Sequence, residues 1–128
     1  MAATAVPENA LFVCAGCMSN VGALSVLAGL EAVNRAGPDK IGVYSLAGLA
    51  TGVSPIIDAT QSAGCLIGVS GCSLNCVERL LRQSGYTVDR SITLEADAHI
   101  EKHSGNQYAP AEFERAVESI LAVMQESC

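Results

Sequence analysis

Four of the six cysteines in this 128-residue chain form two closely spaced pairs. Cys14 and Cys17 are separated by two residues, and Cys72 and Cys76 are separated by three. The shorter spacing lets both sulfurs reach one tetrahedral ion at about 2.3 Å, and the longer spacing places two side chains about one helical turn apart. Together the two pairs would supply the four thiolates of a Zn2+ site.

The two remaining cysteines have no close partner in the sequence. Cys65 begins an apolar segment, so we expect it to be a buried core residue. Cys128 is terminal, and we expect it to be exposed, free and without a role. The segment 1–9 contains neither Lys nor Arg, so it does not resemble a secretory signal. We therefore expect a reducing cytoplasmic compartment, where clustered cysteines more often bind metal or perform redox chemistry.

The charge and composition of the chain argue against two classes of partner. Seven basic and thirteen acidic residues give a formal charge of −6, and the chain has only three Tyr, two Phe and no Trp. Such a chain is unsuited to bind phosphates or to stack on bases, so no nucleic-acid partner is expected.

Residues 11–30 carry no charge, but Gly and polar residues interrupt them and no Lys or Arg lies close on the N-terminal side. We therefore expect no membrane partner.

The order of the predicted elements indicates an α/β fold. Strands are expected at 10–13, 41–46, 65–70 and within 86–94, and helices at 20–36, 55–63, 73–84 and from 110 onward. A Gly-rich loop is expected at 47–53, and a polar loop or broken helix at 95–109. Alternating strands and helices form a parallel sheet with helices on both faces. We predict one domain over residues 1–128, with a loose segment at 1–9. Its doubly wound, Rossmann- or flavodoxin-like sheet should have four strands in the order 2-1-3-4.

This sheet order would bring the cysteine pairs together. The pairs follow the first and third strands, which are neighbours in the predicted sheet, at the carboxyl edge where open α/β sheets bind ligands. Gly16 and Gly71 would let the backbone approach the site and offer N–H donors to the sulfurs. Gly48 lies in a loop that borders the same edge, where it would form a wall close to a ligand.

Three segments resemble the DGC-domain family of zinc-binding proteins, which is named for a central Asp-Gly-Cys motif. They are Cys14-Ala-Gly-Cys-Met-Ser-Asn-Val-Gly22, Tyr44-Ser-Leu-Ala-Gly48 and Gly71-Cys-Ser-Leu-Asn-Cys76. The likeness extends over about residues 11–100. The resemblance implies that Cys14, Cys17, Cys72 and Cys76 chelate zinc, and it identifies a site without specifying a reaction.

The chain departs from the family pattern at two positions. Ser70 stands where the motif has its Asp, so a carboxylate role is lost or not needed. Met18 lengthens the Cys-Ser-Asn junction, which would shift Cys17 relative to the site. Ser70 and Asn20, which lies at the start of a predicted helix, are accessory candidates near the site.

His99 and His103 are a further accessory candidate. They are four residues apart and would share one face of a helix, where they would extend the metal site or move protons. Their polar surroundings favour the alternative, a solvated loop.

Two other cysteine chemistries resemble the first pair but lack key residues. A tyrosine phosphatase or arsenate reductase loop needs an Arg to clamp its oxyanion, and Asn20-Val21 stands where Arg-Ser would be. A thioredoxin motif needs a facing X-Pro, which is not found at a suitable strand start. A second cysteine pair would also be superfluous there.

The leading hypothesis is a metal-binding protein that holds Zn2+ through four cysteine thiolates. A purely structural ion would be unusual at the ligand-binding edge of the sheet, so we expect an exchangeable position that serves metal sensing, delivery or soft-ligand chemistry. One alternative is an Fe–S electron-transfer protein on the same cysteines. Another is a thiol-disulfide oxidoreductase that uses Cys14 and Cys17. Whether the protein is an enzyme stays open, as does a homodimer formed through its Ala- and Gly-rich helices.

Overall fold

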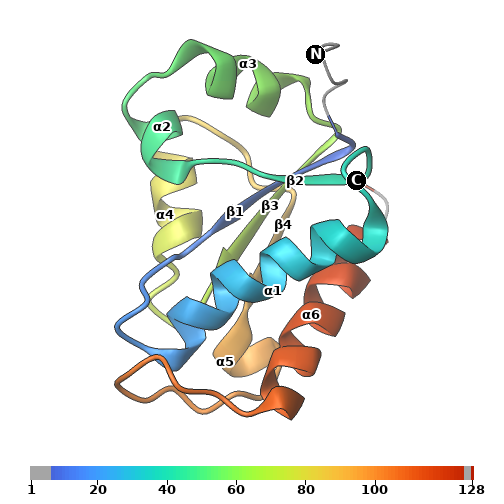
Figure 1. The fold of residues 1–128 in the computed structure, drawn as a ribbon. Coiled ribbons are helices and arrows are strands. Elements are labelled where there is room, and N and C mark those ends of the chain that lie inside the picture. Colours follow the sequence, from blue (N-terminus) through green and yellow to red (C-terminus); the bar gives the residue numbers. More distant parts are fainter. Residues whose placement is uncertain (1–6, 126–127) are drawn as a thin grey trace.

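Four parallel strands form one sheet in the order β2-β1-β3-β4 (Figure 1). The structure is a computed structural model that describes residues 7–125 and 128. The strands are β1 (Asn9–Val13), β2 (Ile41–Val43), β3 (Cys65–Ser70) and β4 (Arg90–Thr93). The helices are α1 (Asn20–Ala36), α2 (Leu46–Ala50), α3 (Ser54–Ser62), α4 (Cys76–Gln83), α5 (Leu94–Asp97) and α6 (Pro110–Met124). The predicted α/β class and the predicted strand order are both confirmed.

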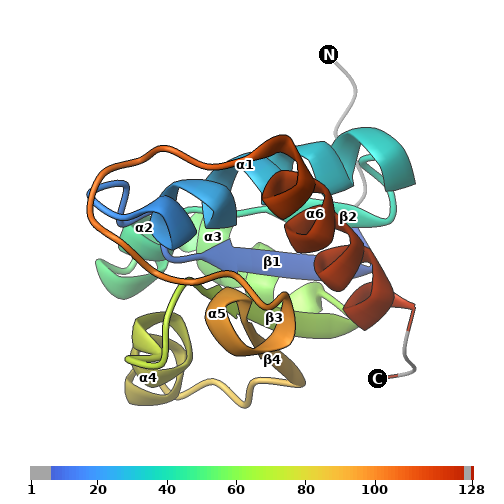
Figure 2. The same ribbon diagram turned by 90° about the horizontal axis from the view of Figure 1, so that it is seen from below.

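The sheet has a hydrophobic cluster on each face because the central strands are apolar along their whole length. All residues of β1 and β3 are buried. Leu11 and Ile67 pack with α1 and α6 on one face, whereas Phe12 and Leu66 pack with α2, α3 and α4 on the other. Figure 2 shows helices on both sides of the strands. Successive side chains of a strand point to opposite faces, so one apolar strand serves both clusters.

Local signals define both ends of α1. The Ser19 hydroxyl accepts a hydrogen bond from the Gly22 N–H at 3.2 Å, which satisfies one unpaired donor of the first turn. The helix ends at Gly37, whose φ of 102° suits glycine. In the last turn, the Arg35 guanidinium bonds the Glu114 carboxylate of α6 and holds the pKa of Glu114 below its ordinary value. This pair links the two helices that cover one face of the sheet.

Two short segments differ from the sequence prediction because of local backbone chemistry. Residues 46–50 form α2, where the last residue of a strand and the start of a loop were expected, since the Ser45 hydroxyl caps the helix by accepting from the Gly48 N–H at 2.9 Å. Helix α4 begins at Cys76 rather than at residue 73. Asn75 has a φ of 53°, which is left-handed and separates the preceding turn from the helix.

The remaining boundaries shift by a few residues. β2 is shorter than expected, and β4 lies within the predicted range. α3 starts and ends one residue earlier, and α5 occupies the start of the predicted polar loop or broken helix. Of the predicted loose segment 1–9, residues 1–6 lie outside the described residues. Asn9 belongs to β1, where its side chain donates to the Lys40 carbonyl at 2.8 Å.

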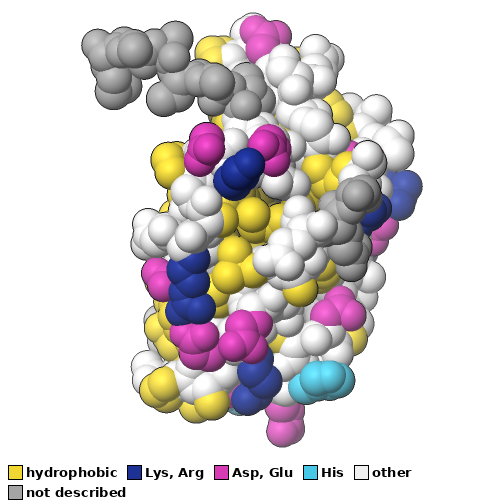
Figure 3. Space-filling model, turned by 90° about the vertical axis from the view of Figure 1, so that its right-hand side faces the viewer, with side chains coloured by type: hydrophobic (Ala, Val, Ile, Leu, Met, Phe, Trp, Pro, Cys, Tyr) yellow, Lys and Arg dark blue, Asp and Glu magenta, His cyan; other side chains and the backbone are white. Residues whose placement is uncertain are grey.

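The surface carries opposite charges next to one another around exposed apolar side chains. Figure 3 shows acidic and basic side chains side by side on one side of the molecule, with hydrophobic side chains between them. The exposed apolar residues of α1 include Leu27 and Leu30.

No helix among the described residues is both long and apolar enough to cross a membrane. The homodimer stays a prediction.

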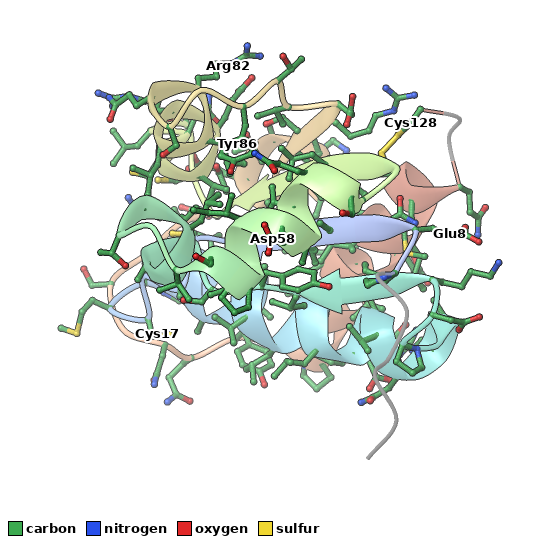
Figure 4. The ribbon with its side chains drawn as sticks, turned by 90° about the horizontal axis from the view of Figure 1, so that it is seen from above. Glu8, Cys17, Asp58, Arg82, Tyr86 and Cys128 are labelled. Carbon is green, nitrogen blue, oxygen red and sulfur yellow. A yellow bond between two sulfur atoms is a disulfide. The ribbon has the colours of Figure 1, made fainter. Side chains whose placement is uncertain are left out.

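Cys128 is not free, which corrects the sequence prediction. Cys65 is buried as expected and Cys128 is exposed as expected, but the two form a disulfide with a Cα–Cα distance of 5.6 Å. Helix α6 packs against the same cluster as Cys65 and returns the chain end to the amino end of β3. Figure 4 shows this bond at Cys128, far from Cys17. The sequence could not reveal the pairing because it depends on where α6 docks.

We expect Cys128→Ser to destabilise the oxidised protein, since the disulfide closes a separation of 63 residues. Such a cross-link restricts the unfolded chain and contributes about 2–4 kcal/mol. Urea unfolding without reductant should show this loss, and the variant and the parent should unfold alike in dithiothreitol. A parent whose unfolding is insensitive to dithiothreitol would contradict the assignment.

Candidate metal centre

The two cysteine loops leave adjacent strands at the same edge of the sheet. Val13 of β1 is in register with Val69 of β3, and the Cys14 N–H extends the ladder by donating to the Val69 carbonyl at 3.1 Å. Cys14 therefore lies beside Ser70 at the carboxyl ends of the strands. The loop after β1 lies at the end of the molecule away from Cys128 (Figure 1).

Backbone contacts hold the two loops against the first turn of α1. A Cβ atom on Gly22 would lie 1.9 Å from the Gly16 carbonyl oxygen, and a Cβ atom on Gly71 would lie 2.9 Å from the carbonyl carbon of Val21. Neither position has room for a side chain. The start of α1 is thus packed between the loop that carries Cys14 and the loop that carries Cys72.

The four thiols at this edge are free but are not gathered into one cluster. Cys14 and Cys72 are half-buried, whereas Cys17 and Cys76 are exposed. Cys14 packs against the hydrophobic cluster on the α4 face, and Cys72 packs against the cluster on the α1–α6 face. Within residues 7–125 and 128, no three Cys, His, Asp or Glu side chains form a group able to hold a metal ion. The structure therefore brings the loops together without gathering three of these described thiols into one group.

The loop after β1 is a tight turn rather than a helix start. Ala15 has a φ of 58°, and its carbonyl accepts from the Cys17 N–H at 3.0 Å. The Ala15 N–H donates to the hydroxyl of the buried Ser25 at 3.1 Å, a support that sequence reasoning missed. Because α1 begins at Asn20, neither thiol of this pair lies in a first helical turn. Of the four, Cys76 is the one that begins a helix.

Ser70 carries a hydroxyl without a partner at the centre of this edge. The residue is only 2 % exposed, and its Oγ has no hydrogen bond to the part of the chain that the structure describes. Ser70 shares a strand face with Gly68, where a Cβ would lie 3.3 Å from Val77 Cγ1 of α4. The hydroxyl thus lies on the same side of the sheet as Cys14. A buried hydroxyl with no partner is costly, so a thiolate or a ligand bound here would satisfy it.

The buried Asn20 fastens a third segment to this edge. Its Nδ2 donates to the Glu101 carbonyl at 2.8 Å, and its Oδ1 accepts from the His103 N–H at 2.8 Å. The Gly105 N–H also donates to the Met18 carbonyl at 2.9 Å, beside a bridge between Ser19 and Ser104. Figure 2 shows the segment between α5 and α6 crossing toward the loop after β1. Asn20 therefore holds the segment between α5 and α6 against the start of α1.

The two histidines do not share a helix face. His99 has a φ of 55°, and both His99 and His103 are exposed on irregular backbone, as the predicted solvated loop requires. His103 lines a cavity of about 510 Å³ together with Met18 and Lys102. The Lys102 ammonium lies 3.4 Å from the Cys72 sulfur, a contact that sequence reasoning missed. The sequence carried one signal for this contact. Lys102 is a basic residue of an acidic chain, and it lies close to the predicted carboxyl edge of the sheet.

A second cavity adjoins Cys14 on the α4 face. It has a volume of about 450 Å³, and its lining includes Tyr44, Ala47 and Leu80. Gly48 is part of α2 and faces α3, since a Cβ there would lie 2.3 Å from Ile56 Cδ1. The glycine permits close packing of the two helices, and its contribution to a ligand site stays a prediction.

The fold and this edge define an open parallel α/β sheet with four free thiols on the segments that follow two adjacent strands. A family model, the DGC domain, matches residues 10–120. The chain belongs to the DGC domain family. No curated protein and no solved structure matches it significantly.

We expect Gly22→Ala to be strongly destabilising, because its Cβ would collide with the Gly16 carbonyl oxygen. Overpacking of this kind costs about 1–3 kcal/mol or more when backbone must shift. Gly29→Ala is the milder comparison in α1, since its Cβ would meet side chains rather than backbone, at 3.3 Å from Val13 Cγ1 and 3.4 Å from Leu11 Cδ2, and helix propensity improves. Urea unfolding should separate the variants by at least about 1 kcal/mol, and equal stability would refute the close contact.

Removing the Ser70 hydroxyl should leave the metal-free protein as stable as the parent or slightly more stable. Ser70→Ala eliminates a buried donor that has no partner, whose burial costs about 1–3 kcal/mol. Thr93→Val is the matched control on β4, because the Thr93 hydroxyl donates to Asn75 Oδ1 at 2.8 Å. The control should lose about 1 kcal/mol in urea unfolding. A comparable loss for Ser70→Ala would mean that the hydroxyl already has a partner.

Proposed function

We propose that the protein binds a soft metal ion, in the first instance Zn2+, through Cys14, Cys17, Cys72 and Cys76. The observation that carries this proposal is that four free thiols follow two adjacent strands, three of them on loops that pack against one helix turn and Cys76 at the start of α4. Thiolates are the ligands that Zn2+ and other soft ions favour. The hydroxyl of Ser70 at the same edge supports the proposal because it lacks the partner that a bound thiolate would supply.

Metal binding would have to draw the sulfurs together at the edge of the sheet. Cys14 and Cys72 pack toward opposite faces, but both lie beyond the last residues of their strands. Cys17 and Cys76 are exposed and free to turn. We therefore infer that the site is completed when the ion binds, so that binding joins the loop after β1 to the loop after β3.

The accessibility of this edge favours an exchangeable ion over a buried structural one. Two of the four thiols are exposed, and Cys14 borders a cavity large enough for a small molecule. The formal charge of −6 attracts cations rather than anions. We propose metal sensing or delivery, with a soft ligand able to occupy one position, in a single domain.

Metal content measured on the reduced chain under anaerobic conditions tests the proposal. We expect one colourless Zn2+ per chain by elemental analysis, and loss of that ion in Cys72→Ser. Cys128→Ser is the matched control, because it removes a cysteine at the opposite edge and should keep the ion under the same reducing conditions. Unchanged zinc in Cys72→Ser would remove Cys72 from the ligand set.

The same preparation distinguishes the other cysteine chemistries. A brown protein that contains iron and sulfide would overturn the zinc assignment in favour of an Fe–S cluster. A metal-free protein whose Cys14 and Cys17 convert between dithiol and disulfide would identify a thiol oxidoreductase instead. An absorption spectrum and mass spectrometry of the alkylated cysteines separate these outcomes.

A further inference from the structure

A lysine contacts one of the four free thiols across a large separation in sequence. The Lys102 Nζ lies 3.4 Å from Cys72 Sγ, within the range of a hydrogen bond to sulfur. Lys102 is the one Lys or Arg of the segment that connects α5 to α6. The contact thus places a positive charge at a loop that would hold a metal ion.

The backbone on both sides of Lys102 is tied to the protein. The Glu101 carbonyl accepts from the Asn20 side chain, and the His103 N–H donates to it, so the anchor points flank Lys102 directly. Asn20 is fully buried, and its own N–H donates to the His103 carbonyl at 3.3 Å. Although the Lys102 side chain is exposed, its base is therefore held over the cysteine loops.

A four-thiolate zinc centre is stabilised by a nearby positive charge. Zn2+ with four thiolates carries a net charge of about −2, whereas four protonated thiols are neutral. Binding the ion thus makes this edge more negative, in a chain that is already acidic. The Glu95 carboxylate, which accepts from the Ser73 N–H at 3.4 Å, lies beside the same loop and adds to the negative charge.

We propose that Lys102 is a positioning residue of the metal site, which orients Cys72 by an N–H···S hydrogen bond and offsets part of the negative charge of the bound centre. This inference rests on the proposed function, which assigns Cys72 as a ligand. Groups that bond to metal ligands in this way typically change metal affinity by about 10- to 100-fold. The Lys102 side chain is exposed, so its effect on zinc affinity lies near the tenfold end of this range and weakens as salt is added.

Zinc affinity of the reduced full chain, measured by competition with a coloured chelator at low and high salt, tests this role. We expect Lys102→Met to bind Zn2+ about tenfold more weakly at low salt, with a smaller difference at high salt. Lys102→Arg keeps the charge and should retain most of the affinity. Lys40→Met is the matched control, since Lys40 is also exposed but pairs with Glu8 at the opposite edge of the sheet.

The outcomes separate the two proposals. If the parent binds Zn2+ and Lys102→Met binds it as tightly as the parent does, the role of Lys102 is wrong and metal binding stands. If Lys40→Met weakens binding equally, the effect comes from net charge and the contact with Cys72 is irrelevant. If the parent binds no Zn2+, the proposed function fails and this inference fails with it. Urea unfolding of each variant shows whether a changed affinity reflects a changed fold.

Discussion

The carboxyl edge of the sheet depends on the close approach of the first turn of α1 to two other backbone segments. Gly22 meets the Gly16 carbonyl, and Gly71 meets the backbone at Val21, at distances that leave no room for a Cβ atom. Ser19, which caps the helix, and Asn20, which anchors the segment near Lys102, are the adjoining residues. One helical turn therefore sets the relative positions of three loops.

This arrangement explains which parts of the fold the sequence could predict. The strand order follows from alternating apolar strands and helices, and α1 and α6 are marked by local signals, Ser19 and Gly37 for one and Pro110 for the other. These features depend on nearby residues and on the general rules for parallel sheets. Helix α2 was missed because glycines in the segment outweighed the capping role of Ser45 in the prediction.

The parts that were missed at the site are long-range contacts. Lys102 reaches Cys72 because Asn20 fastens a distant segment, and Cys128 reaches Cys65 because α6 docks on α1. Neither contact has a local signature, since each depends on how whole elements pack. The separation of Cys14 and Cys72 has a different origin. The side chain of Cys14 follows the alternation of side chains along β1 and packs on the α4 face. The chain turns at Gly71, and Cys72 packs on the α1–α6 face.

The six cysteines consequently divide between the two ends of β3. At its amino end, a disulfide ties the chain terminus to the sheet, and at its carboxyl end four thiols remain free. The two groups are separated by the length of a six-residue strand, which spans about 20 Å. Oxidation of the first group therefore need not consume the thiols of the second. A metal ion bound at the carboxyl end would join β1 to β3 through their loops, as the disulfide joins β3 to the chain end after α6. Both ends of β3 would then be cross-linked through sulfur. The amino end would be joined by the disulfide and the carboxyl end by the bound metal ion.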